Sequence, residues 1–162
     1  MSENKDLTII LSKCGEANKA KIMAVKNQEL LAKIASRIGL CNPKDLFIHT
    51  GSAEDFEYIK KMSLEAGEEM PLAMGGHTIH FDPPAEQGRV VKQTYVVEDE
   101  DMYINSATNA LPRVQADDLI QDNMKNIMDG KTMLVGFYIR GPVGAPTAYA
   151  SLTISDTWYL AH

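Results

Sequence analysis

The sequence has little of what marks a secreted, zinc-binding or membrane-spanning protein. It contains only two cysteines, Cys14 and Cys41, and no C-x-x-C pair, so it suggests neither a disulfide framework nor a zinc site. No apolar stretch approaches the roughly 18 uncharged residues that a membrane-spanning helix needs, and the polar amino terminus lacks the apolar region of a secretion signal. We therefore expect a cytoplasmic protein with no membrane association.

Basic residues are also in short supply. The chain has 16 Lys and Arg against 22 Asp and Glu, which gives a formal net charge of −6 at pH 7. The basic residues are scattered rather than gathered into a stripe, so the phosphate-neutralising surface of a nucleic-acid-binding protein is not expected. A small anion remains a possible ligand, because one or two arginines are enough to bind it locally.

The remaining composition is that of an ordinary globular protein. Its 162 residues are 44% hydrophobic and 23% charged, and no low-complexity segment interrupts them. This length suits one domain with one core, so we expect a single domain over residues 1–162.

Hydrophobic spacing and turn residues predict alternating helices and strands in the first 131 residues. The predicted helices cover 15–26, 28–38 with Gly39 at its end, Ser52 to Gly67, and Asp117 to Gly130. The predicted strands and extended segments are 7–11, 46–49, 77–82 and 94–97. The buried face is expected to hold Phe56, Ile59, Met62 and Ala66 in the third of these helices, and Leu119, Ile120, Met124, Ile127 and Met128 in the fourth.

The last 31 residues differ from the rest because only two of them are charged, Arg140 and Asp156. Residues 132–139 and 148–154 are both strand-like, and the Gly/Pro-rich segment 141–146 connects them. Strands this poor in charge are typical of the middle of a sheet that is covered on both faces. The predicted fold is thus α/β, with flanking helices on a mixed sheet that includes a C-terminal hairpin at about 132–154.

The apolar end of this segment, residues 158–160, has two interpretations. Either further polypeptide covers these strands, or the terminal residues dock onto the domain's own sheet. The composition favours neither.

Several motifs suggest chemistry but are better explained as structure. Gly130-Lys-Thr132 is not a phosphate-binding loop, since Lys125 occupies the position of its first glycine and a strand follows instead of a helix. The turn at 141–146 does not match a dinucleotide-binding pattern. His77, His80 and Asp82 supply at most two ligands on one face of an extended segment, which is too few for a metal site. His49 and His162 have no visible partner.

Arg89 is the strongest candidate for a binding residue. It follows the Gly/Pro-rich loop 82–88 and precedes the strand predicted at 94–97. A guanidinium in that position can bind a carboxylate or a phosphate through two N–H donors.

Three stretches together resemble the amino-terminal domain of GTP-type phosphoenolpyruvate carboxykinases. They are NPKDLFIHTGSAEDFEYI at 42–59, DPPAEQGRVVKQTYVV at 82–97, and DGKTMLVGFYIRGPVGAPTAYASLTISDTWYL at 129–160. The last stretch is the most specific, because it combines a G-[KR]-T-M start, an apolar strand, a G-P-x-G-[SA]-P turn and a strand that ends in T/S-D.

The resemblance implies a cytosolic, two-lobed enzyme of gluconeogenesis. Such an enzyme converts oxaloacetate and GTP to phosphoenolpyruvate, GDP and CO2, and uses Mn2+ and Mg2+. In the family an arginine that matches Arg89 holds the carboxylates of oxaloacetate and phosphoenolpyruvate. The family's phosphate-binding loop, metal ligands and guanine-binding residues lie beyond the point that corresponds to His162, so the nucleotide and metal domain is missing from this chain.

From this resemblance we expect that the 162 residues alone have no carboxykinase activity, hold no cofactor and bind the substrate only weakly. Metal stabilisation of the reacting charges contributes far more than the roughly 2–3 kcal/mol of an arginine clamp. The alternative is a stand-alone, noncatalytic module with the same fold that binds an anion or a partner protein.

Overall fold

The computed structural model describes residues 5–82, 94–99 and 108–162. These residues form two compact units, one made of Met1–His80 with Asn126–His162 and the other of Phe81–Lys125. Each unit is described by itself, and the single domain expected over 1–162 stays a prediction.

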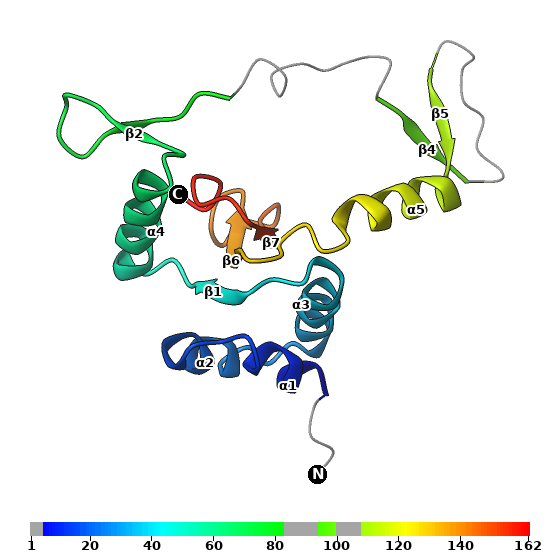
Figure 1. The fold of residues 1–162 in the computed structure, drawn as a ribbon, viewed down its shortest axis with the longest axis horizontal. Helices are drawn as coiled ribbons and strands as arrows, with labels where there is room; N and C mark the ends of the chain where they lie inside the picture. Colours follow the sequence, from blue (N-terminus) through cyan, green and yellow to red (C-terminus); the bar gives the residue numbers. More distant parts are fainter. Residues whose placement is uncertain (1–4, 83–93, 100–107) are drawn as a thin grey trace. The chain divides into compact units, whose positions relative to one another are not determined.

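The first unit is built on a three-stranded mixed sheet in the order β1-β6-β7. Strand β1 (Asp45–His49) pairs in parallel with β6 (Thr132–Arg140), and β6 pairs antiparallel with β7 (Tyr149–Ser155). The predicted fold class and the C-terminal hairpin are therefore confirmed (Figure 1). Among the described strands only β6 is central, so the prediction that both charge-poor strands lie in the middle of the sheet is wrong for β7.

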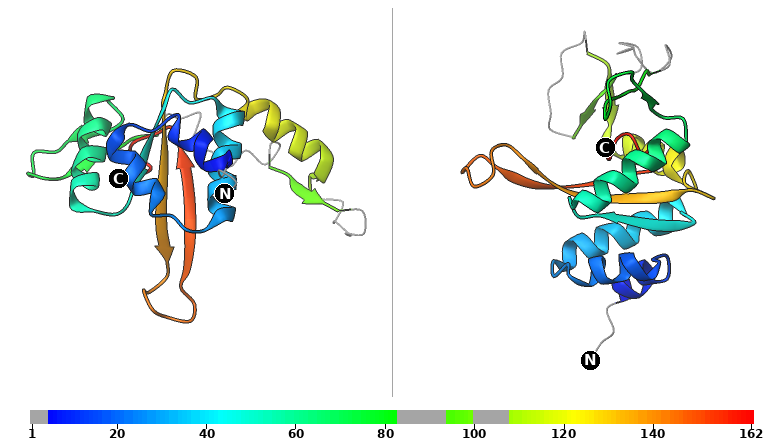
Figure 2. Two further views of the ribbon diagram at one scale, coloured as in Figure 1. Left: turned by 90° about the horizontal axis from the view of Figure 1, so that it is seen from below. Right: turned by 90° about the vertical axis from the view of Figure 1, so that its left-hand side faces the viewer.

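Helices lie on both faces of this sheet. Figure 2 shows α4 (Ala53–Glu65) on one face, and α1 (Lys5–Leu11), α2 (Glu16–Met23) and α3 (Gln28–Cys41) on the other. The inner part of the sheet is consequently dry, and its residues join those of the helices in the core. The fully or nearly fully buried apolar side chains include Ile10, Ile22, Leu31, Ile34, Ile48, Ile59, Met133 and Val135.

Helix α1 contradicts the prediction of a strand at 7–11. The β-branched run favours a strand, but Leu7, Ile10 and Leu11 are also spaced for one face of a helix. The helix packs against α3 and buries Ile10 completely. Burial of this face outweighs the weak local preference.

Helix α3 extends beyond its predicted end. The Asn27 side chain caps its start by accepting hydrogen bonds from the backbone N–H groups of Glu29 at 2.9 Å and Leu30 at 3.3 Å. Gly39 was predicted to end the helix, but the helix continues to Cys41. The residue that caps it, Asn42, adopts the left-handed conformation with φ 53°. Asparagine tolerates this conformation, and Pro43 then prevents further helix.

Helix α4 begins as predicted, because the Ser52 side chain accepts a hydrogen bond from the backbone N–H of Asp55 at 3.1 Å. It ends at Glu65, and Gly67 follows with φ 72°. The buried residues are Asp55, Ile59 and Ser63, so the prediction is confirmed for Ile59 but not for Phe56, Met62 and Ala66. Phe56 is 40% exposed, because α4 is rotated so that Asp55 points toward the sheet.

A short antiparallel pair follows α4, made of β2 (Met70–Pro71) and β3 (Thr78–Ile79). Strand β3 confirms part of the extended segment that was predicted at 77–82. The connection between β6 and β7 is a loop over 141–148 in which Gly141 and Gly144 have φ of 90° and 81°. Such angles favour glycine, so the Gly/Pro motif at 141–146 is a structural turn.

The second unit contains β4 (Val96–Glu98), β5 (Ala110–Pro112) and α5 (Arg113–Met124). Strands β4 and β5 are parallel, and α5 starts four residues before the predicted Asp117. Its one buried residue is Ala116, and it ends at Met124 rather than at Gly130. Leu119, Ile120 and Ile127 are exposed, so the predicted buried face is wrong for them; Met128, beyond the helix, is buried as predicted. The helical spacing of Leu119 and Ile120 therefore does not mark a buried face within this unit.

Candidate functional site

Arg89, the predicted substrate ligand, lies outside the described residues. Its role is therefore still a prediction from the sequence. The described part of the chain offers three other groupings of polar side chains: one at the end of β1, one at the carboxyl-terminal tail, and one on the β6–β7 hairpin.

The first grouping is a buried ion pair at the carboxyl end of β1. The Asp55 carboxylate accepts hydrogen bonds from the backbone N–H and the hydroxyl of Thr50, at 2.8 and 2.7 Å, and from Lys21 Nζ at 2.5 Å. Lys21 also donates to the Ile48 carbonyl at 3.0 Å and lies over the Phe47 ring. These contacts attach α2 and α4 to the same strand end.

The electrostatics of this grouping favour a charged Asp55 and a neutral His49. Burial disfavours the Asp55 carboxylate, but the hydrogen bonds from Lys21 and Thr50 outweigh that effect and lower its pKa. Burial also lowers the pKa of His49, and the proximity of Asp55, with Nδ1 to Oδ2 at 3.9 Å, opposes this only in part. His49 is 1% exposed, and its Nδ1 has no hydrogen-bond partner.

His49 is held by aromatic side chains rather than by polar ones. Its ring meets Phe56 edge-on at 4.7 Å between centroids and lies 5.7 Å from the Tyr138 ring. The Tyr138 ring covers Gly136, where a side chain would collide with it. A buried, neutral imidazole in this setting packs the sheet and does not face a substrate.

The second grouping attaches the carboxyl-terminal tail to the segment after α4. His162 Nδ1 lies 2.9 Å from Oε2 of Glu69. The other carboxylate oxygen, Oε1, accepts a hydrogen bond from the Thr78 hydroxyl at 2.6 Å. The backbone N–H of Tyr159 donates to Glu68 at 2.9 Å. Ala161 is buried in a small cluster with Phe47, Ile59 and Leu134. Of the two interpretations of residues 158–160, the structure therefore shows docking onto the domain's own sheet.

Of the histidines considered as metal ligands, His80 is used for packing and His77 is exposed. The His80 ring stacks on Tyr159 at 3.6 Å between centroids, and its Nδ1 lies 2.5 Å from the Glu68 carbonyl. Within residues 5–82, 94–99 and 108–162, no three His, Cys, Asp or Glu side chains gather in a way that could hold a metal ion. The described residues thus do not fit the Mn2+ and Mg2+ that the resemblance implies.

Lys131, in the sequence that resembles a phosphate-binding loop, is engaged elsewhere. Its Nζ lies 2.5 Å from the Asp156 carboxylate, and Gly130 precedes it in the left-handed conformation. Both cysteines are free and buried. In the described helices, none is long and apolar enough to cross a membrane.

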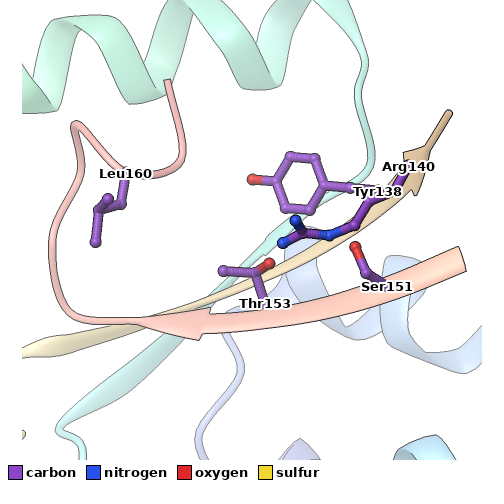
Figure 3. A pocket seen from close by; sticks show the side chains of 5 residues that line it. All are labelled: Tyr138, Arg140, Ser151, Thr153 and Leu160. Atoms are coloured by element: carbon purple, nitrogen blue, oxygen red, sulfur yellow. The ribbon is translucent and has the colours of Figure 1, made fainter. Parts of the chain in front are cut away.

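The third grouping is a pocket of about 280 Å³ on the β6–β7 hairpin. Its lining residues are Tyr138, Arg140, Ser151, Thr153 and Leu160. The antiparallel register pairs Tyr138 with Ser151 and Gly136 with Thr153, so these side chains share one face of the sheet. Figure 3 shows the Arg140 guanidinium between the Tyr138 ring and Thr153, with Leu160 across the pocket.

This pocket can donate hydrogen bonds but contains no acidic side chain. It combines one guanidinium with three hydroxyl groups, and burial raises the pKa of Tyr138, so that its hydroxyl stays protonated at neutral pH. In the sequence alone, Arg140 stands out only as one of the two charged residues among the last 31. Tyr138 and Arg140 are two residues apart on one strand, as are Ser151 and Thr153 on the other, so each pair shares a face of its strand. That the two pairs meet in one pocket can be predicted only when the register of the strands is known.

Comparison with known proteins gives a consistent result. A sequence model described as the phosphoenolpyruvate carboxykinase N-terminal domain matches residues 32–162. Among curated relatives, phosphoenolpyruvate carboxykinase [GTP] of Saccharolobus solfataricus is 35% identical over 143 residues, and that of Thermococcus sibiricus is 36% identical over 142. The enzyme of the same name from Neocallimastix frontalis is 27% identical over 142 residues.

The alignments cover 86–88% of this chain but only 23% of each of these relatives. This chain thus spans about a quarter of their length. The match includes the whole sheet of the first unit and all of the second, and it agrees with the resemblance of the three sequence stretches. The chain belongs to the family of phosphoenolpyruvate carboxykinase N-terminal domains.

Proposed function

We propose that this chain is the substrate-holding part of a GTP-dependent phosphoenolpyruvate carboxykinase. The whole enzyme would be cytoplasmic and would convert oxaloacetate and GTP to phosphoenolpyruvate, GDP and CO2 in gluconeogenesis. The observation that carries this proposal is the family match over residues 32–162, which contains the Arg89 stretch.

Arg89 is assigned to the carboxylates of oxaloacetate and phosphoenolpyruvate. A guanidinium binds a carboxylate through two parallel N–H donors, which fixes its orientation as well as its charge. Lysine provides the charge without the planar, two-point geometry. This assignment rests on the resemblance of residues 82–97, with Arg89 five residues before Thr94.

Binding of GTP, Mn2+ and Mg2+ is assigned to polypeptide that this chain lacks. The alignment with its relatives covers only 23% of their length, and the described residues offer no metal cluster. A bound divalent ion supplies the charge stabilisation that phosphoryl transfer requires. The residues of this chain hold and orient the substrate carboxylates, and this alone gives no turnover.

Two measurements on the 162-residue chain test the proposal. Incubation with oxaloacetate, GTP and Mn2+ should yield no phosphoenolpyruvate, and turnover would contradict the assignment. Titration with phosphoenolpyruvate should show weak, saturable binding that Arg89→Met reduces by about tenfold or more. Arg89→Lys should bind with intermediate affinity, whereas Arg37→Met, which removes the same charge from α3, should bind like the original chain.

Equal affinity in Arg89→Met and Arg37→Met would remove Arg89 from the site. The gene sequence gives an independent test against the stand-alone module. An open reading frame after the His162 codon that encodes a phosphate-binding loop would support the carboxykinase. A stop codon there would support the module.

A further inference from the structure

The pocket on the β6–β7 hairpin has an uncompensated positive charge. No described residue forms an ion pair or a hydrogen bond with the Arg140 guanidinium. The only other charged residue from Thr132 to His162 is Asp156, and its carboxylate pairs with Lys131. By contrast, Arg113 in the second unit forms a two-point pair with Asp99.

The same pocket contains an unsatisfied hydroxyl. Ser151 Oγ is buried and has no hydrogen-bond partner in the described structure. An unsatisfied buried polar group costs about 1–3 kcal/mol, so such atoms are uncommon and call for an explanation. Figure 3 shows this hydroxyl pointing toward the Arg140 side chain.

Movement of Arg140 would open this hydroxyl to a ligand. Arg140 is exposed at the end of β6, and exposed side chains change rotamer within nanoseconds. Rotation of the guanidinium away from the sheet would leave Ser151 and Thr153 facing the pocket. An anion could then contact the guanidinium on one side and the hydroxyls on the other.

We propose that this pocket binds a small oxyanion, a phosphate or a carboxylate group, between Arg140 and the hydroxyls of Tyr138, Ser151 and Thr153. Hydrogen bonds from a guanidinium to such groups are about twice as strong as neutral ones. The volume of about 280 Å³ lies just below the range typical of drug-sized ligands, so the ligand is a small metabolite or a free ion. This site is additional to Arg89 and does not rest on the carboxykinase assignment.

The test is a titration of the 162-residue chain with inorganic phosphate and, separately, with oxalate, at constant ionic strength set by sodium chloride. Amide and side-chain NMR signals of β6 and β7 should shift saturably with at least one of the two. Tighter binding of phosphate assigns the site to phosphorylated molecules, and tighter binding of oxalate assigns it to carboxylates.

Variants identify the residues responsible. Arg140→Met should weaken the binding by about tenfold or more, and Ser151→Ala by a few-fold. Arg37→Met is the matched control, because it changes the net charge equally and should leave the affinity unchanged. All three positions can be checked for folding by the urea midpoint, which Arg140→Met should not change because the side chain is exposed.

Three outcomes would overturn the inference: no saturable shift in β6 or β7, equal weakening by Arg140→Met and Arg37→Met, or unchanged affinity in Arg140→Met. The Arg89→Met variant separates this proposal from the previous one. If it loses phosphoenolpyruvate binding but keeps the phosphate- or oxalate-induced shifts in β6 and β7, both proposals stand. If Arg140→Met keeps those shifts while Arg89→Met loses them, only the pocket is refuted.

Discussion

The two edges of the three-stranded sheet differ in how their polar groups are satisfied. Along β1, Asn18 accepts from the Ile48 N–H at 2.9 Å and donates to the Leu46 carbonyl at 3.0 Å. Lys21 donates to the Ile48 carbonyl, and the Lys13 carbonyl accepts from the Leu46 N–H. Side chains and backbone from the first helices thus close this edge.

Along β7 the described residues provide no comparable closure. The hydrogen bonds of this strand run to β6, and none from another described element reaches its outer edge. Among the described residues, Ser151 of β7 and Arg140 at the end of the neighbouring β6 also lack side-chain partners. Unpaired strand edges and unsatisfied donors are where proteins meet ligands or further polypeptide. The two edges therefore differ: β1 is closed by the first helices, and β7 is open among the described residues.

The largest test of this comparison is removal of the buried carboxylate at the end of β1. Asp55→Ala leaves Lys21 and both donors of Thr50 without their acceptor, so we expect a loss of about 3 kcal/mol in the free energy of unfolding. The matched control is Asp156→Ala, which breaks the exposed pair with Lys131 and should cost less than about 1 kcal/mol. Urea denaturation measures both. Equal losses would mean that the end of β1 is not specially stabilised.

A smaller effect compares two polar side chains on the two sides of the sheet. Asn18→Ala breaks one donor and one acceptor bond to β1 and should destabilise the chain by about 2 kcal/mol. Ser151→Ala removes a hydroxyl without a partner and should leave the stability unchanged or raise it slightly, by at most about 1 kcal/mol. A strong loss from Ser151→Ala would show that its hydroxyl is satisfied, and the two sides would then be alike.

The smallest effect is a pH dependence from His49. Because its folded-state pKa is lowered, the unfolded chain binds a proton first as the pH falls below the ordinary histidine value of about 6.5. The stability linked to this histidine is complete above that value and declines as the pH falls toward the folded-state pKa, by at most about 1.4 kcal/mol per pH unit.

Replacement of His49 by Gln should remove this contribution. The urea midpoint of the variant, followed from pH 8 to pH 5, should fall less steeply than that of the original chain. His77→Gln, an exposed replacement in the same unit, is the matched control. Parallel slopes for the original chain and His49→Gln would mean that folding does not lower the pKa of His49.

Much of the fold was predictable because its signals are local. The Ser52 cap, the glycine after α4 and the Gly/Pro turn at 141–146 each depend on residues a few positions apart. The hairpin followed from two charge-poor, β-branched runs on either side of that turn. The order of the same motifs also indicated the family, which the comparison confirmed.

The incorrect predictions involve packing partners from distant parts of the chain. Residues 7–11 became a helix because α3 offers an apolar face, and α4 turned Asp55 inward because Lys21 and Thr50 bind it there. No local pattern contains those partners. The same limit applies to the start of α5, which a proline precedes instead of the expected acidic cap.

The sequence by itself determined where the chain turns, where most helices begin and to which family it belongs, since these depend on residue types at short spacing. Only the tertiary structure decided that Tyr138, Arg140, Ser151 and Thr153 form one pocket and that β1 is closed by α2. The physical reason is that side chains alternate along a strand, so the sequence shows which residues share a face of one strand. Which residues of two neighbouring strands meet depends on the strand register, and the sequence does not contain it.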